Sequence, residues 1–377
     1  MPLTIQPYRA EHEPLVAAFN QRLRAAGEDE NMVFYKSSEP RWLPRADGSC
    51  MYNEFFVALD TGPEGTVCRG GYALKTQDFL FPDGQARAIG YYHHPLSEGI
   101  VSKAHAALGM LLLRDAMQRS PLLYCLGMGG YENPLPQMLI RLGWTHCPVP
   151  FFFRVLSPAK FLRQMGPLRQ SAARRLALDV AAFTGAGWAA STAYQAYRSL
   201  AAASTKSGVA REVQVFGAET QALWEQARST SSLTAVRDQK SLGVLYPASE
   251  SHLTRIEVER DGKLIGWAVV GERRKDLKYG NLRVASVVDC YALSGEYLAV
   301  VRAATETLRK QQFDLILTNQ SHQDWCAAFK AAGCLSGPSN FLFAASKPLA
   351  ALLAPFEQVR PRMHFTRADG DGLPRNY

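Results

Sequence analysis

The stretch HHPLSEGIVSKAHAALGMLLLR, residues 93–114, decides how the chain is expected to fold. Its part from Leu96 to Val101 reads as the end of a strand, and Ser102 to Ala104 reads as a short loop. A helix then follows, and its first turns carry a regular set of leucines. Upstream of this point the pattern predicts a sheet, and just downstream it predicts the other wall of the same cleft.

The helix has one apolar face, because Leu108, Leu111 and Leu112 recur at helical spacing. A strand that passes through a small-residue loop into a helix leaves several backbone N–H groups free at the helix start. Together with the helix dipole, these groups form a site for an anion such as a pyrophosphate.

Strands and helices alternate on both sides of this stretch. Hydrophobic periodicity predicts strands at 3–8, 54–59, 66–75, 88–93, 122–128 and 151–155, and helices at 11–24, 106–118 and 133–142. The order is therefore β-α-β-β-β-α-β-α-β.

Length and composition bound the class of protein. With 377 residues the chain exceeds one ordinary core, so two domains are expected. Its 42 basic and 34 acidic residues give a net charge of +8, which suits an anionic ligand, a polyanion or an anionic membrane surface. No arginine tract or zinc-finger spacing occurs, so no specific nucleic acid is expected.

Cysteine usage and the first residues favour a cytoplasmic location. The seven cysteines are scattered, odd in number and without a CxxC pair, which predicts reduced thiols. The N-terminal residues lack the basic-then-apolar order of a signal peptide. No metal is expected, because Asp369-Gly-Asp371-Gly lacks the further ligands of a calcium loop and is predicted to be a solvated turn.

In addition to the element order, two stretches carry a resemblance, SEGIVSKAHAALG at 97–109 and NPLPQMLIRLGW at 133–144. Through these features, residues 1–156 resemble the GNAT superfamily of N-acetyltransferases. The resemblance implies that the loop wraps the pyrophosphate of acetyl-CoA or another acyl-CoA, while the flanking strands hold the pantetheine arm. The cofactor-binding residues implied in this way are Ile100, Val101, Ser102, Lys103, His105, Ala107, Leu108, Gly109 and Asn133.

The chain departs from the family's loop pattern, Gln/Arg-x-x-Gly-x-Gly/Ala. It offers Ala104-His-Ala-Ala107-Leu-Gly109, so the arginine is absent and the first glycine is alanine. In addition, Ile140 stands where the family's tyrosine general acid is expected.

A second set of the same elements follows a basic, helical region. Strands are predicted at 253–260, 264–272, 284–291, 313–318 and 341–345, and helices at 219–230, 296–311 and 323–332. Two copies in tandem are similar to the FemABX-type peptidyl transferases and other double-domain acyltransferases, in which the copies share one cleft.

The predicted fold class is therefore α/β (α+β), with two tandem GNAT-like domains, each a mixed, mostly antiparallel sheet flanked by helices. The predicted boundaries are residues 1–156 for the first domain, 157–210 for a helical linker, 211–350 for the second domain and 351–377 for a tail.

The linker carries a heptad seam, and the stretch from Val180 to Tyr197 has no charged residue. Its members are Leu176, Val180, Phe183, Gly187, Ala190, Tyr194 and Tyr197. The favoured interpretation is an interdomain helix that buries this seam, since the stretch is too polar for a transmembrane span. The alternative is weak contact with a membrane surface.

Acyl transfer to an amine needs a base, donors for the developing oxyanion and an oriented thioester. Glu98 beside the strand end is the favoured base, followed by His93 and His94, whose imidazoles titrate near neutral pH. Backbone N–H groups of Ile100 and Val101 lie where the fold places its carbonyl-polarising donor. The alternatives are a surface carboxylate for Glu98 and half-buried polar residues for the histidines.

Further candidates follow buried strands in both copies. Tyr131 is a candidate proton donor to the leaving thiolate, and Glu132 is a candidate substrate-binding residue in the same cleft. In the second copy Asp289, Asn319 and His322 are candidate substrate-binding residues, although Asp289 also fits a strand-end cap. Arg237 and Asp238 suggest a structural ion pair.

A covalent mechanism is disfavoured, because no GxSxG motif occurs and no cysteine has a histidine at useful spacing. The leading hypothesis is an acyl-CoA-dependent N-acyltransferase, most simply an N-acetyltransferase, in which a small-molecule or conjugated amine attacks directly in a ternary complex. One alternative is an aminoacyl transferase that uses aminoacyl-tRNA, as in FemABX proteins. The other is a degenerate binding or scaffold protein. The acceptor and the oligomeric state are left open.

Overall fold

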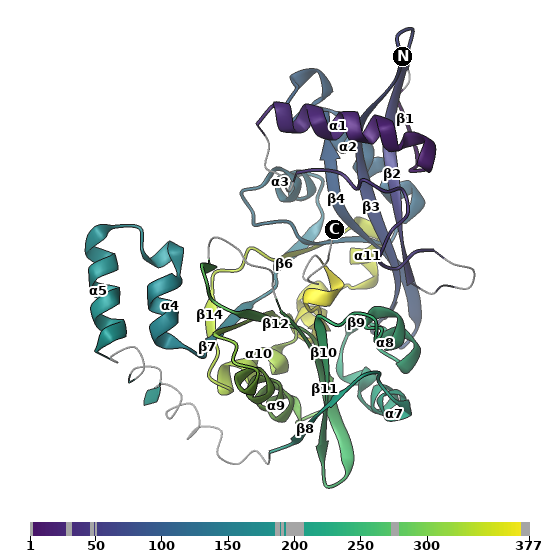
Figure 1. Cartoon of the computed structure of the whole chain (residues 1–377). Coiled ribbons are helices and arrows are strands. Elements are labelled where there is room, and N and C mark those ends of the chain that lie inside the picture. Colours follow the sequence, from purple (N-terminus) through teal and green to yellow (C-terminus); the bar gives the residue numbers. More distant parts are fainter. Residues whose placement is uncertain are drawn as a thin grey trace.

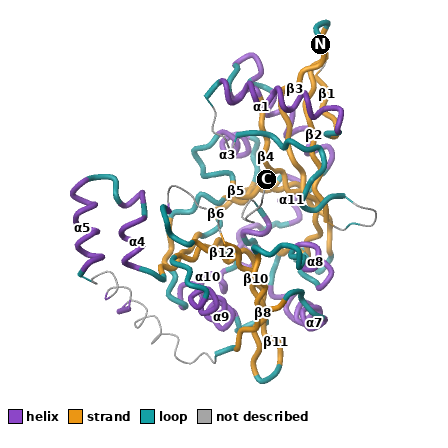
Figure 2. Tube along the Cα trace, in the orientation of Figure 1, coloured by secondary structure: helices purple, strands orange, loops and turns teal. Residues whose placement is uncertain are grey.

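The computed structural model describes residues 3–27, 32–45, 49, 51–184, 189, 192–193, 207–272 and 279–370. Strands within these ranges gather into two sheets, one formed mainly by the first half of the chain and one by the second (Figure 1). Helices lie on the outside of both groups of strands (Figure 2). The predicted fold class is confirmed, with two mixed and mostly antiparallel sheets, each flanked by helices.

The first sheet has the strand order β1-β2-β3-β4-β5-β15-β6. Its strands are β1 (Leu3–Pro7), β2 (Met51–Gly62), β3 (Gly65–Leu80), β4 (Ala86–Ser97), β5 (Leu123–Gly127), β15 (Leu342–Ala345) and β6 (Thr145–Pro148). Its helices are α1 (Glu13–Ala25), α2 (Leu108–Arg119) and α3 (Pro134–Arg141).

Alternation along β2 explains how helices cover both faces of this sheet. Phe55, Val57 and Leu59 pack with residues of α1, whereas Phe56 and Ala58 pack with residues of α2 and α3. Because successive side chains of a strand point to opposite faces, a nearly continuous apolar run supplies both cores.

The second sheet has the order β14-β7-β13-β12-β11-β10-β8. Its strands are β14 (Leu335–Gly337), β7 (Phe151–Val155), β13 (Leu315–Asn319), β12 (Val284–Ala292), β11 (Lys263–Glu272), β10 (Leu253–Arg260) and β8 (Val209–Val213). Its helices are α7 (Ala218–Ala227), α8 (Gln239–Leu245), α9 (Tyr297–Lys310) and α10 (Gln323–Ala331). The same alternation recurs, because Trp267 faces α7 and α8 while Ala268 faces α9 and α10.

The two sheets exchange one strand each. β15, from the end of the second half, lies between β5 and β6 of the first sheet. In return β7, from the end of the first half, lies between β13 and β14 of the second sheet. The expectation that Phe151–Val155 closes the first unit and Phe341–Ala345 the second is therefore wrong, because an apolar strand does not specify its partner in the sequence.

Four smaller elements contribute to one apolar cluster with residues of the first sheet. They are β9 (Leu233–Ala235), β16 (Met363–His364), α11 (Lys347–Leu352) and α12 (Phe356–Val359). β9 pairs with the end of β3 and with β16, so it links the first sheet to the last part of the chain. The strands β6, β8, β9, β14 and β16 were not predicted from the sequence.

The predicted linker forms a helical hairpin of α4 (Pro158–Gln164) and α5 (Ala172–Phe183) at one margin of the molecule (Figure 1). The prediction that its seam is buried is wrong for the described members. Leu176, Val180 and Phe183 are 69%, 54% and 85% exposed, because α5 turns a different face toward α4. The other seam positions, Gly187, Ala190, Tyr194 and Tyr197, lie outside the described residues.

Residues 363–370, here called the C-terminal segment, are almost entirely buried. The prediction of a solvated turn at Asp369 is therefore wrong. The Asp369 carboxylate accepts hydrogen bonds from the guanidinium of Arg237 at 2.9 and 3.1 Å, in a site where both side chains are inaccessible to water. Asp371 lies outside the described residues.

Candidate functional site

β4 and β5 are parallel neighbours that separate soon after they meet. They pair only at Gly90 with Leu123 and at Tyr91 with Tyr124, and then diverge. We call this divergence the first wedge. A β-bulge follows in β4, where His94 takes a φ of 51° and one extra residue opposes β3. Such bulges bend a strand and re-aim its side chains.

The loop after β4 leads to an open helix start. Two 3₁₀ turns, Glu98–Ile100 and Lys103–His105, precede α2, and no side chain caps this helix. The N–H groups of Leu108 and Gly109 have no hydrogen-bond acceptor among the described residues. A Cβ added to Gly109 would meet only open space. The predicted anion site at the start of α2 is therefore accessible.

Upstream of α2 the loop bonds to itself. The N–H groups of Val101 and Ser102 both donate to the carbonyl oxygen of Glu98, at 3.1 and 2.8 Å. The predicted role of the Val101 N–H as a carbonyl-polarising donor is therefore not favoured. Ile100 is largely exposed. Lys103 has no ion-pair partner within the described part of the chain, so its charge is available to an anion at the helix start.

Glu98 is held by two arginines. Its carboxylate accepts a hydrogen bond from Arg22 Nε at 2.7 Å and one from the guanidinium of Arg69 at 2.9 Å. His105 Nε2 lies 3.9 Å from the same carboxylate. Burial by itself would raise the pKa of Glu98, but the hydrogen bonds from Arg22 and Arg69 outweigh it, and the pKa lies below its usual range.

These contacts argue against Glu98 as the general base. Both of its oxygens already accept hydrogen bonds, and a lowered pKa weakens the carboxylate as a proton acceptor. The geometry instead fits a carboxylate that fixes the loop onto α1 and β3. No sequence pattern identified Arg22 and Arg69, because each occupies an ordinary polar position of its element.

His93 lies on β4 just past the point where the strands diverge. Its ring stacks on Tyr91, with centroids 4.8 Å apart, and its Nε2 lies 3.3 Å from Asn53 Oδ1. Asn53 Nδ2 donates to the carbonyl of Trp42, so its Oδ1 is the atom that faces the histidine. Because that oxygen only accepts, a neutral His93 carries its hydrogen on Nε2 and its lone pair on Nδ1.

Around His93 lies a buried row of polar side chains, which we call the polar row: Asn53, Lys75, Gln77 and His93. Strand register places all four on one face of the first sheet. Lys75 Nζ lies 3.4 Å from the carbonyl of Ala368 in the C-terminal segment. Both amide atoms of Gln77 lack a hydrogen-bond partner among the described residues. Alternation along β3 could have revealed this row, because polar residues fall on its core-facing side.

His94 and the residues after β5 lie near the wedge but are engaged locally. His94 Nε2 lies 2.7 Å from the carbonyl of Val33. The Tyr131 hydroxyl lies 3.3 Å from His146 Nδ1, and burial raises the pKa of Tyr131. Asn133 Nδ2 donates to the carbonyl of Met128, and Glu132 is exposed.

The second copy also has a wedge, but the chain's own C-terminal segment fills it. β12 and β13 pair over three residues, from Val284 with Leu315 to Ser286 with Leu317, and then diverge. Thr366 Oγ1 donates to Asp289 of β12 at 3.1 Å, and Arg367 donates to Asn319 of β13 at 2.6 Å.

Asp289 is fully buried, so the predicted contact with an acceptor is not favoured. It accepts hydrogen bonds from Arg237 Nε and from the Tyr246 hydroxyl. Arg237 therefore pairs with Asp289 and Asp369, and the predicted pair with Asp238 is wrong. Asp238 instead caps the start of α8 through the N–H of Ser241.

Asn319 and His322 are likewise engaged inside the second half. Asn319 lies against Arg367, and His322 Nδ1 accepts from the N–H of Asp324 as the cap of α10. Burial lowers the pKa of His322. The structure thus brings His93 to the first wedge and leaves Asp289, Asn319 and His322 on the far side of the C-terminal segment.

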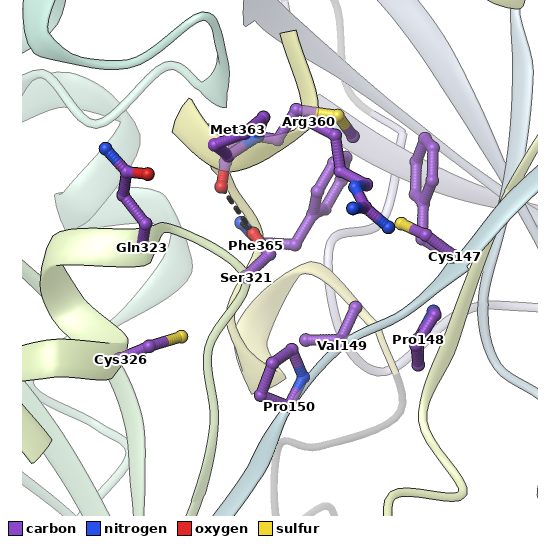
Figure 3. A pocket seen from close by; sticks show the side chains of 12 residues that line it. Cys147, Pro148, Val149, Pro150, Ser321, Gln323, Cys326, Arg360, Met363 and Phe365 are labelled. Carbon is purple, nitrogen blue, oxygen red and sulfur yellow. Dashed lines mark hydrogen bonds between the residues drawn. The ribbon is translucent and has the colours of Figure 1, made fainter. Parts of the chain in front are cut away.

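One cavity of about 340 Å³ lies where β6 crosses to the second sheet, and it is mostly apolar (Figure 3). Figure 3 shows Arg360 beside Cys147, and burial raises the pKa of that thiol to about 12. A second hollow of about 470 Å³ lies against the outer side of α2. Neither cavity contains the loop before α2. The described residues hold no cluster of three metal-ligating side chains.

Comparison with known proteins identifies the fold. No protein-family model and no curated protein sequence matches the chain. Among solved structures, N-myristoyltransferase of Saccharomyces cerevisiae with bound myristoyl-CoA is 12% identical, with a TM-score of 0.53, over 92% of this chain and 84% of that one. A GCN5-related N-acetyltransferase from Anabaena variabilis is 11% identical, with a TM-score of 0.52, over 91% of this chain and 72% of that one.

At such low identity these likenesses establish the fold, which is the fold of GNAT-type N-acyltransferases. The predicted GNAT resemblance is confirmed at this level, and the two sheets have equivalent strand orders. Similarity to FemABX-type transferases stays a prediction.

Proposed function

We propose that the protein is an acyl-CoA-dependent N-acyltransferase in which an amine attacks the thioester directly. The observation that carries this proposal is the first wedge. There two parallel strands part beside a helix whose first N–H groups are free and accessible. A helix start of this kind suits a pyrophosphate, and the parted strands suit an extended pantetheine arm. Lys103 supplies a nearby positive charge.

The first copy is the proposed donor site. Its wedge is bordered by the open start of α2, whereas the wedge of the second copy is filled by Thr366 and Arg367. N-myristoyltransferase of Saccharomyces cerevisiae has the same fold and was crystallised with bound myristoyl-CoA, which supports an acyl-CoA as the donor. The proposed donor is acetyl-CoA or another acyl-CoA, the proposed acceptor is a small-molecule or conjugated amine, and the proposed location is the cytoplasm.

His93 is the proposed base. Its Nε2 is held by Asn53, so Nδ1 carries the lone pair that can take a proton from the amine. The polar row is the proposed side of the sheet on which the acceptor binds, because Gln77 offers an unused amide there. Acyl transfer then forms the amide bond, breaks the thioester bond and leaves the thiolate of CoA to be protonated.

Ligand-induced stabilisation tests the donor site. A ligand at about 100 times its dissociation constant stabilises the folded state by about 2.7 kcal/mol, which raises the melting temperature. Acetyl-CoA and free CoA should both give such a shift. Gly109→Trp should abolish it without unfolding the protein, because space is open at that Cβ.

Lys263→Ala is the matched control, since Lys263 is an exposed lysine of the β10–β11 turn, far from α2 in the fold. It should leave the shift intact, whereas Lys103→Ala should reduce it. The absence of any shift with millimolar acetyl-CoA, free CoA or myristoyl-CoA would refute the donor assignment and favour a binding protein that has lost the cofactor.

A further inference from the structure

In the helical hairpin, α4 packs at the edge of the second sheet, whereas α5 lies on the side of α4 away from both sheets (Figure 1). The two helices pack on each other, and Phe161 and Met165 of the α4 region attach the hairpin to the edge of the second sheet. Arg169 fixes the two arms together, because its guanidinium donates to both oxygens of Asp179 at 2.8 and 3.0 Å. The outer face of α5 therefore belongs to an ordered element.

That outer face is uncharged and exposed. Leu176, Val180 and Phe183 follow one another at i, i+4 and i+7, which places them on one side of the helix. The other exposed residues on this side are Ala172, Ala173, Ala177 and Thr184. A phenylalanine that is 85% exposed beside a leucine that is 69% exposed gives an apolar stripe without a protein partner in the described chain.

Positive charge flanks this stripe. Residues 157–184 contain five basic side chains and one acidic side chain, Asp179, which is already paired with Arg169. Arg163, Arg174 and Arg175 are exposed and have no carboxylate partner among the described residues. The hairpin thus contributes a net charge of +4, half of the chain's +8, from a small fraction of its length.

We propose that the α4–α5 hairpin docks the protein on an anionic lipid bilayer surface, with the outer face of α5 in the interface. An apolar helix face bordered by arginines is the pattern of a helix that lies in the headgroup region. Lys160 is paired with Asp314 of the second half. A second copy of the same hairpin would still bring two sets of the unpaired Arg163, Arg174 and Arg175 together, and this repulsion disfavours self-association.

α5 cannot cross the bilayer. Its 12 residues span about 18 Å as a helix, whereas the hydrocarbon core is about 30 Å thick. No described helix is long and apolar enough to span a membrane. This proposal is independent of the proposed catalysis, since none of its residues lies at the first wedge.

Vesicle co-sedimentation tests the docking. The full-length protein should bind phosphatidylcholine vesicles with 30% phosphatidylglycerol at 150 mM salt, and it should bind pure phosphatidylcholine at least about tenfold more weakly. Each basic residue near an anionic surface strengthens binding about fivefold, so Arg174→Gln with Arg175→Gln should weaken it about 30-fold. Leu176→Ser with Phe183→Ser should weaken it by about tenfold or more.

Matched controls separate docking from general effects. Val244→Ser and Leu352→Ser change apolar side chains that are also exposed, at 40% and 42%, but lie on other helices, so they should leave binding unchanged. All variants should keep their melting temperature within about 1 °C, because the substituted side chains are exposed.

Two results would overturn the proposal. The first is equal binding of the wild type to neutral and anionic vesicles, or binding of both double variants to anionic vesicles that equals the binding of the wild type. The other is a dimer, seen by analytical ultracentrifugation, that Leu176→Ser with Phe183→Ser dissociates while no vesicle binding occurs, which would assign the face to a second copy.

Discussion

Arg237 is expected to be a residue on which the junction of the two halves depends. It reaches Asp289 of the second sheet at 3.0 Å and Asp369 of the C-terminal segment at 2.9 Å, and all three side chains are almost completely buried. Arg237→Met would keep much of the volume but leave two buried carboxylates without their cation. Breaking one buried ion pair in this way costs about 3–5 kcal/mol.

The expected loss of stability can be converted to a melting shift. An unfolding entropy of about 2.1 cal/mol/K per residue gives roughly 0.8 kcal/mol/K for a chain of this length, so the melting temperature should fall by about 4–6 °C. Urea unfolding followed by tryptophan fluorescence should give the same loss as a free energy of unfolding.

The loss should also depend on pH. Burial raises the pKa of Asp289 in the native protein, although Arg237 opposes this effect. A carboxyl group whose pKa is higher in the folded state contributes stability at low pH and loses it as pH rises through the raised value. Without Arg237 the effect of burial on the Asp289 carboxyl group is no longer opposed, so the deficit of Arg237→Met should be smaller at pH 5 than at pH 8.

A triple variant supplies the control. Combining Arg237→Met with Asp289→Asn and Asp369→Asn removes the unpaired charges, so it should recover at least about half of the lost stability. A stability of Arg237→Met within about 1 kcal/mol of wild type at pH 7.5 would contradict this expectation, and so would a triple variant less stable than the single one.

Two further predictions concern the candidate site and a third concerns buried thiols. His93→Gln should lower the rate of acyl transfer about 10²–10⁴-fold and remove the acid limb of the pH–rate profile, whereas Asn53→Ala should weaken the rate but keep the limb. Glu98→Gln should keep the acid limb yet cost about 1–3 kcal/mol of stability at pH 7. Because the pKa of Glu98 is lowered in the folded protein, this loss of stability should shrink as pH falls below about 4. Loss of the acid limb in Glu98→Gln would instead identify Glu98 as the base. Burial raises the pKa of Cys147 and Cys326 to about 12, so at pH 8 only about 1 in 10⁴ of these thiols is ionised, and a thiol reagent should label them slowly in native protein and quickly in urea.

The local elements of this protein were predictable from its sequence. The alternation of Phe55 to Leu59 specifies a strand with two apolar faces, and the loop before Leu108 specifies a strand, a loop and a helix in that order. Within that helix the predicted buried face was partly wrong. Leu111 was expected to be buried but is exposed, and Leu113 is buried instead. The period of a pattern fixes a face only to within about one residue.

Polar roles were much less predictable. Glu98, named as a base beside a strand end, meets Arg22 from 76 residues away and Arg69 from 29 residues away. Neither partner is marked by its local sequence. His93 became the better candidate only when the strand register placed it next to Asn53, 40 residues earlier.

The exchange of β7 and β15 between the two sheets was visible in the tertiary structure and not in the sequence. β7 and β15 are short apolar strands, and backbone hydrogen bonds can form with any strand of suitable length. The sequences of β7 and β15 therefore do not specify the sheet in which they pair. The exchange arises because each strand completes the other half's sheet. The partner of Asp369 was equally unpredictable, because it is Arg237, 132 residues earlier. For α5, periodicity could detect the apolar face. The exposure of that face was not predictable, because it depends on the absence of a neighbouring element in the described structure.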